Sequence, residues 1–164
     1  EELETTNEEL QSTNEELETM NEELQSTNEE LQTINEELRE RTDELNHSNA
    51  FLNSILSSLR GGVAVVDSNF KILIWNYLAE DLWGLRSDEV KGQSLLSLDI
   101  GLPVGKLRAP VHAALSDGGQ PQELILDALN RRGRSIKCRV SVGPFRGPKG
   151  VPEGAVITME EMGM

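Results

Sequence analysis

The sequence predicts an α+β domain, an antiparallel sheet of about five strands with helices on one face, preceded by a long coiled-coil helix. Leucine recurs every seven residues through the first third of the chain, which is the spacing of a coiled coil. Short apolar segments separated by Gly, Pro, Asn and Asp follow, in the order two strands, short helices and three strands. Acidic residues are concentrated in the leucine-repeat segment. The chain therefore divides into a helical rod, residues 1–59, and one globular domain, residues 60–164.

The rod is built from a nearly identical repeat. Residues 3–16 and 17–30 differ only at Thr6 and Met20, as expected for a periodic segment and not for a globular core. A helix over the whole rod would be about 90 Å long at 1.5 Å per residue. A leucine stripe on so polar a helix needs a partner. We expect a parallel homodimer, although an antiparallel pair or a higher oligomer would bury the leucines too. The predicted dimerisation residues are Leu3, Leu10, Leu17, Met20, Leu24, Leu31, Ile34, Leu38, Leu45, Leu52, Ile55 and Leu59.

The heptad register has two solutions. Placing the leucines at d puts a column of asparagines at a, which lowers stability. Placing them at a puts Thr6, Thr13, Met20, Thr27 and Ile34 at d, and this second register is favoured because it buries more apolar surface. A single isolated helix is disfavoured, since neighbouring turns carry like charges such as Glu18 and Glu22.

Charge separates the rod from the domain. Residues 1–59 contain 17 acidic and 2 basic residues, a net charge of −15, and residues 60–164 contain 12 acidic and 13 basic residues, a net charge of +1. A leucine repeat that binds DNA carries a basic region, which is absent here. The sequence thus predicts no nucleic-acid partner and a solvated acidic face on the rod.

Length and composition set further bounds. The 105 residues after the rod suffice for one core. The longest apolar runs are too short to cross a bilayer, and one cysteine cannot form an internal disulfide. These features favour a cytoplasmic protein. The chain begins in mid-repeat at Glu1, which suggests a fragment of a longer protein.

The first half of the domain reads as a helix end, two strands and short helices. Gly61-Gly62 should end the rod helix. Residues 62–67 and 70–75 are predicted strands around a turn at 67–69. Asn76 should cap a helix over 77–83 that closes at Gly84, and Ser87 should cap a second that ends at Gly92.

The second half should contain one more helix and three strands. Residues 104–115 should be helical, and Pro110 should either make the first turn irregular or move the start of the helix. Strands are expected over 123–130, 135–142 and 154–161, the last two separated by a Gly/Pro-rich loop, 146–154. In the middle strand, alternation places Ile136, Cys138, Val140 and Val142 on one face.

This order of elements, with the Trp75-Asn76 pair, the Ala79-Glu80 helix and Gly92, resembles the PAS sensory domains. The resemblance covers residues 60–164 and implies the PAS fold. The rod sequence NEELQSTNEELQTINEELRERTDELN, followed by FLNSIL, is similar to the linker in proteins that join chemotaxis methylesterase and glutamate methyltransferase domains to PAS modules. The final strand, VITMEEM, lacks the Asp-x-Thr that couples many PAS domains to a downstream helix.

Candidate ligand-binding residues are few. His112 lies on the helix from which some PAS domains coordinate haem, although a helix-surface histidine is the favoured interpretation. Cys138 lies in an alternating strand and not in the helical motif of flavin photoreceptors, which favours core packing. Trp75 and Trp83 can stack on a ring-shaped ligand such as a flavin or fill the core, and the core is again favoured. The sequence names no catalytic residue, no metal site and no definite cofactor, with haem and flavin the candidates considered.

Taken together, these observations predict a non-enzymatic PAS sensor and dimerisation module of a chemotaxis-type methyltransferase signalling protein. The full-length protein would carry the methylesterase and methyltransferase activities in other domains. Two alternatives keep the fold: a ligand-free structural tether, and the input module of a sensor histidine kinase. An enzyme is disfavoured because no nucleophile is paired with a base.

Overall fold

The computed structural model describes residues 1–116 and 118–163. The chain forms two compact units, Glu1–Leu52 and a second that begins at Asn53. The predicted domain range, 60–164, includes Asp117 and Met164, which lie outside the described residues.

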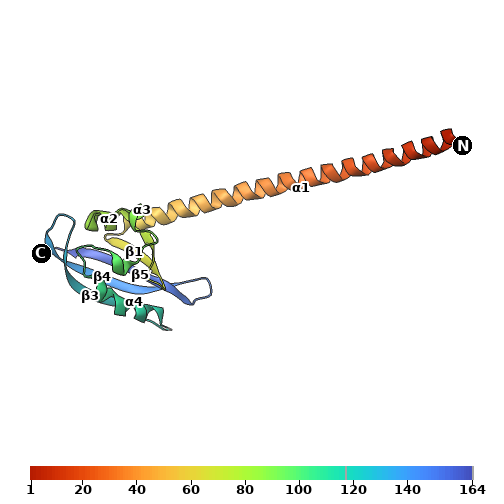
Figure 1. The fold of residues 1–164 in the computed structure, drawn as a ribbon. Helices are drawn as coiled ribbons and strands as arrows, with labels where there is room; N and C mark the ends of the chain where they lie inside the picture. The colour runs from red at the N-terminus through yellow and green to blue at the C-terminus, as the bar shows by residue number, and fades with distance from the viewer. Residues whose placement is uncertain (117, 164) are drawn as a thin grey trace. The chain divides into compact units, whose positions relative to one another are not determined.

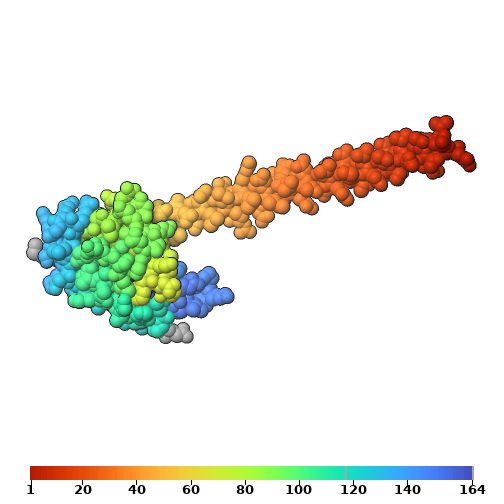
Figure 2. Space-filling view, viewed as in Figure 1, coloured from red at the N-terminus to blue at the C-terminus, as the bar shows by residue number. Residues whose placement is uncertain are grey.

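Helix α1 spans Glu2–Ser58 without interruption (Figure 1). Its 57 residues correspond to about 86 Å. All side chains along it are exposed except that of Leu56, which is half-buried. The heptad leucines from Leu10 to Leu45 retain between 56 and 65% of their accessible surface. In Figure 2 the atoms of this helix are coloured from red to orange along its length. The predicted long helix is therefore confirmed, and it ends one residue before Leu59.

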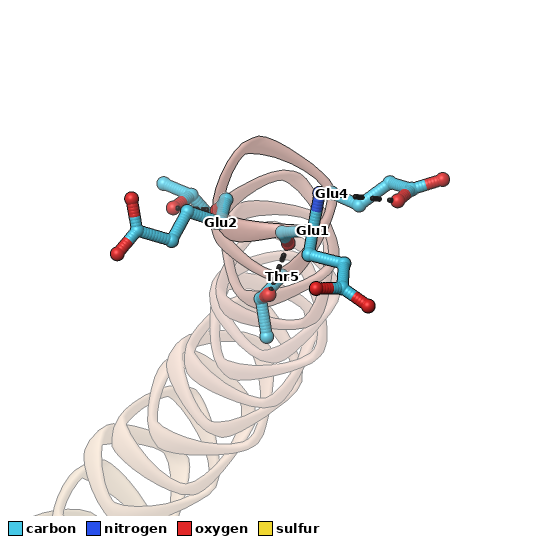
Figure 3. Close-up of polar contacts among 5 residues, drawn as sticks. Glu1, Glu2, Glu4 and Thr5 are labelled. Carbon is cyan, nitrogen blue, oxygen red and sulfur yellow. Dashed lines mark hydrogen bonds and ion pairs between the residues drawn. The ribbon is translucent and has the colours of Figure 1, made fainter.

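Threonine hydroxyls on α1 bond to the backbone one turn earlier. In Figure 3 the Thr5 hydroxyl donates to the Glu1 carbonyl, 2.6 Å away, and the terminal amine pairs with Glu4 at 3.6 Å. Thr13 and Thr27, both at d in the favoured register, donate in the same way to Glu9 and Glu23 at 2.8 Å. These hydroxyls are satisfied within the helix, so burying the threonine methyl groups does not require a polar partner.

The second unit contains an antiparallel sheet. Among the described residues the sheet has five strands in the order β2-β1-β5-β4-β3, and each neighbouring pair is antiparallel. The strands are β1 (Gly62–Asp67), β2 (Ile72–Trp75), β3 (Gln122–Leu129), β4 (Ser135–Arg146) and β5 (Pro152–Met162). The prediction of an antiparallel α+β domain behind a long helix is confirmed.

One face of this sheet forms the core. In β4 the four residues predicted to share a face, Ile136, Cys138, Val140 and Val142, are buried. Ala64 and Val66 of β1 pair with Trp75 and Ile72 of β2 and contribute to the same cluster. Alternation of apolar and polar residues therefore identifies the core face correctly in β4.

Short helices cover the core beside the sheet. They are α2 (Tyr77–Trp83), α3 (Ser87–Val90), the 3₁₀ turns η1 (Leu95–Ser97) and η2 (Val104–Leu107), and α4 (Arg108–Leu115). Helix α2 packs on β1, and α4 packs on β4 and β5 (Figure 1). As predicted, Asn76 caps α2 and Gly84 ends it, at φ 79°. The predicted cap at Ser87 was wrong by one residue: Arg86 precedes the helix, and its N–H donates to the Glu89 carboxylate.

The Gly/Pro-rich loop is shorter than predicted. Strand β4 continues to Arg146, which pairs with Pro152 at the start of β5. A tight turn joins them, in which the N–H of Gly147 donates to Val151 and the N–H of Gly150 to Gly147. Pro144 fits in β4 because β3 pairs with β4 only as far as Val142, so the proline lies on a free edge.

Candidate functional site around Asn76

Asn76 is the one buried polar residue among those the structure describes, with 7% of its surface exposed. It follows the last residue of β2 and precedes α2. Its backbone is extended (φ −81°, ψ 168°), as a helix N-cap requires. Its side chain is therefore directed into the junction between these elements and not toward water.

The Asn76 side chain makes four hydrogen bonds. The oxygen Oδ1 accepts from the N–H groups of Val63 (2.7 Å) and Ala79 (2.9 Å). The amide nitrogen Nδ2 donates to the carbonyls of Leu56 and Gly61, each at 3.2 Å. An asparagine amide offers two donors and an acceptor oxygen with two lone pairs, so the full capacity of the side chain is used.

Glycines beside Asn76 permit the chain to lie close to β5 and α2. A Cβ atom at Gly61 would lie 2.6 Å from the Met159 carbonyl oxygen, and one at Gly62 would lie 3.0 Å from Cα of Ala79. The Asn76 N–H also donates to the Val63 carbonyl at 3.0 Å. The Gly61-Gly62 pair, predicted only as a helix end, thus also lets β1 pass between β5 and α2.

These contacts join four segments through one amide: the last turn of α1, the turn after it, the first strand and the start of α2. The Leu56 carbonyl belongs to the end of a helix, where carbonyls lack partners within the helix. Sequence analysis identified the Asn76 cap but missed its bonds to Leu56 and Gly61. No sequence signal points to them, because they depend on how the helix end meets the sheet.

Trp75 and Cys138, both sequence-predicted candidates, lie in the buried core. The Trp75 side chain is 4% exposed, and its Nε1 donates to the Leu85 carbonyl at 3.0 Å. Trp83 is similarly buried, with Nε1 3.3 Å from the Met159 sulfur. Both indoles therefore pack in the core with their N–H groups satisfied.

Cys138 is fully buried in β4. Burial raises the pKa of its thiol from 9.0 to about 11; a backbone hydrogen bond from Glu160 opposes this rise, and the charge of Glu161 adds to it. A thiol with a raised pKa is a poor nucleophile at neutral pH, because the reactive species is the thiolate. This environment matches the packing role favoured from the sequence.

His112 lies on α4, as predicted, but its side chain is exposed. Its ring packs edge-to-face against Phe70, with ring centroids 5.2 Å apart. The structure therefore places Trp75 and Cys138 in one buried cluster and His112 at the surface. The predicted dimerisation residues lie along α1 and remain predictions.

No helix in residues 1–116 and 118–163 is both long and apolar enough to cross a membrane.

Solved structures with similar folds include PAS domains. A VqmA dimer from Vibrio cholerae, solved in the absence of its target DNA, has a TM-score of 0.59 and 16% identity over 67% of this chain and 51% of its own. The PAS domain of an HTR-like protein from Haloarcula marismortui has a TM-score of 0.58 and 14% identity, over 76% of this chain and 99% of its own.

A sensory box sensor histidine kinase from Vibrio cholerae matches with a TM-score of 0.53 and 15% identity, over 76% of this chain and 99% of its own. The chain spans between 48 and 56% of the VqmA structures that it matches. A comparison with curated proteins gave no match. At these identities the structures establish the fold alone.

The family model described as the PAS fold matches residues 50–162, more than half of the chain. The matched range contains all five strands and the Asn76 junction. The chain belongs to the PAS fold family.

Proposed function

We propose that this PAS domain relays a signal to α1, and that α1 dimerises the chain within a bacterial chemotaxis-type methyltransferase signalling protein. The observation that carries the proposal is the hydrogen bond from Asn76 to the Leu56 carbonyl. Leu56 is part of the same uninterrupted helix as the heptad leucines. A rearrangement of the β2–α2 junction would act on the end of that helix, because one side chain binds both.

Dimerisation through α1 is supported by its surface. The leucine stripe has no covering element in the described chain, and a helix this polar gains stability by burying it against a second copy. The favoured register places Thr13 and Thr27 in the seam, where their hydroxyls already have backbone partners. We therefore keep the leucines at a and propose a parallel pair, which places both PAS domains at the same end.

The methyltransferase context rests on the likeness of the rod to the linker of methylesterase, methyltransferase and PAS fusion proteins. Under this proposal the fragment is itself non-enzymatic, cytoplasmic and without a nucleic-acid partner. The acidity of residues 1–59, with 17 acidic and 2 basic residues, supports the last point. Catalysis would belong to other domains of the longer protein.

A second candidate is the input module of a sensor histidine kinase. It is favoured by the likeness to a sensory box sensor histidine kinase from Vibrio cholerae. Both candidates use the same relay and differ in the effector domain.

A ligand-free tether is the third possibility. Native mass spectrometry and an absorbance spectrum of the purified chain separate it from a sensor. A stoichiometric ligand or chromophore supports the sensor, and clean apo protein supports the tether.

Light scattering of the purified chain tests the proposed dimer. We expect a dimer at about 10 µM and a monomer for the double variant Leu24→Asp/Leu31→Asp. The matched control, Ser26→Asp/Thr33→Asp, adds the same charge at positions outside the a and d seam in both registers and should remain dimeric. A monomeric wild-type chain, or equal loss of the dimer in both variants, would rule out the leucine seam.

A further inference from the structure

A cleft lined by arginines lies on the second unit. Four arginines line it, and we call it the arginine cleft: Arg60, Arg131, Arg132 and Arg134. Its volume is about 270 Å³. Arg60 lies between α1 and β1, and the other three come from the turn between β3 and β4. The sequence did not reveal this cluster, because Arg60 is distant in the chain from the other three.

Hydrogen bonds to its backbone hold the turn that carries three of these arginines in place. The Asn130 side-chain oxygen accepts from the N–H groups of Arg132 (3.0 Å) and Arg134 (3.1 Å). The Arg131 N–H donates to the Leu82 carbonyl of α2 at 2.9 Å. Gly133 has a positive φ of 72°, which glycine adopts without strain. The arginine side chains therefore start from a fixed backbone.

The cleft carries an excess of positive charge. Two carboxylates, Asp81 and Glu161, line it beside the four arginines, giving a net charge of +2. Arg131 pairs with Asp81 at 2.8 Å. Within the described chain, Arg60, Arg132 and Arg134 have no carboxylate within ion-pair distance. Three of the guanidinium groups that line the cleft thus have no carboxylate partner there.

We propose that the arginine cleft binds a small phosphoryl-bearing anion. A guanidinium group presents a planar set of N–H donors that matches phosphate oxygens in a bidentate geometry. A phosphoryl group offers three strong acceptor oxygens and close to two negative charges at neutral pH, so it can neutralise several guanidinium groups at once. A bound anion would supply Arg60, Arg132 and Arg134 with the negative charge that no described carboxylate provides.

The position of the cleft connects such a ligand to the Asn76 site. Gly61 lines the cleft and is also the residue whose carbonyl accepts from Asn76 Nδ2. A bound anion would therefore lie beside the turn that Asn76 holds against the sheet. Anion binding itself does not depend on the relay proposed above.

Isothermal titration calorimetry of the full chain with pyrophosphate, at constant ionic strength, tests this site. We expect saturable binding of one anion per chain. The double variant Arg132→Ala/Arg134→Ala should weaken binding at least about tenfold, since a hydrogen bond to a charged group contributes enough for a tenfold change in affinity. The control Lys106→Ala/Lys149→Ala removes the same charge outside the cleft and should bind as tightly as wild type.

Three results would overturn the proposal: no heat of binding to wild type at millimolar pyrophosphate, equal weakening in both double variants, or citrate binding as tightly as pyrophosphate. The first shows that there is no site, the second shows unspecific charge attraction, and the third removes the preference for a phosphoryl group. Circular dichroism of both variants verifies that they fold as the wild type does. The substituted side chains are exposed, so folding should be retained.

Discussion

The hydrogen bonds of the Asn76 side chain join the end of α1 to the sheet. Two of its four partners, Val63 and Ala79, are backbone donors within the domain, and the other two are the carbonyls of Leu56 and Gly61. Removing the amide leaves all four groups without this partner. The loss should therefore affect both the stability of the domain and the order of the last turn of α1.

Asn76→Ala is expected to lower the free energy of unfolding by about 2 to 4 kcal/mol, since each buried polar group left unpaired costs about 1 to 3 kcal/mol. Asn76→Ser should lose less, because a serine hydroxyl can still cap α2. Urea unfolding measures both. Asn69→Ala is the control: its side chain is exposed, and its backbone N–H bond to Asp67 is retained. A loss for Asn76→Ala no larger than the control's would show that the amide is dispensable.

Cys138 provides a prediction on pH dependence. Its pKa is raised from 9.0 to about 11 in the folded chain by burial. The folded state therefore favours the protonated thiol, and the associated stability is complete below about pH 9 and lost as pH rises toward about 11. At about 1.4 kcal/mol per pKa unit, the loss is roughly 2 to 3 kcal/mol.

Chemical unfolding at a series of alkaline pH values, with wild type and Cys138→Ala compared, measures this loss. The variant lacks the thiol, so its stability should decline less steeply than that of wild type between about pH 9 and 11. Parallel curves for the two proteins would contradict the pKa shift. In the same experiments, a thiol reagent at neutral pH should label wild type only after unfolding.

At the scale of single elements, the acidity of α1 makes its pairing sensitive to conditions. Seventeen carboxylates and two basic residues in residues 1–59 leave glutamates without opposite charges across the helix pair. Repulsion between them opposes association, and salt screens it. The isolated peptide 1–59 should therefore gain helix on addition of salt, and also on acidification from about pH 7 to about pH 4.

Circular dichroism of that peptide measures both effects. A peptide with Gln in place of Glu at positions 8, 15, 22 and 29 has the same length and leucine stripe, so it should be more helical at low salt and respond less to salt. Less helix at the acidic pH than at neutral pH, in the unsubstituted peptide, would contradict this account of the charges.

The elements also show what the sequence could and could not predict. The sequence correctly predicted α1, the core face of β4, and the cap and the end of α2. Each of these depends on local residue spacing or on a single residue such as Gly84. The prediction was wrong at the β4–β5 connection, where composition indicated a loop but Arg146 pairs with Pro152. Pro144 and Pro152 are compatible with strands there only because of their sheet positions, which sequence spacing does not encode.

The candidate sites were likewise predictable from the sequence only in part. The capping role of Asn76 was predictable from the Trp75-Asn76 step into a helix. Its bonds to Leu56 and Gly61, and the gathering of Arg60 with Arg132 and Arg134, arise from segments that are distant in sequence and meet only in the folded domain. No local sequence pattern predicts which distant segments come into contact.

For the whole molecule, the continuity of α1 gives a prediction about signal output. The helix runs from Glu2 to Ser58 without a break, so each residue inserted within it rotates the preceding part by about 100° relative to the domain, whereas seven residues restore the face to within about 20°. In the full-length protein, one residue inserted after Asn46 should change output strongly, and a whole heptad at the same place should largely preserve it.

The readout is effector activity, measured for proteins that light scattering shows to be dimers. The two insertions lie at the same site and differ chiefly in helical phase, so the heptad insertion is the control for the single one. Equal effects of the two, with dimers intact, would identify α1 as a passive spacer and favour the tether.

The pairing of β1 with β5 has a consequence for how such a domain can be combined with others. Gly62, at the start of the first strand, lies opposite Met159, near the end of the last. The polypeptide thus enters and leaves the sheet at neighbouring points. A domain connected in this way can be inserted into a longer chain, or duplicated in series, with little change in the separation of the segments on either side of it.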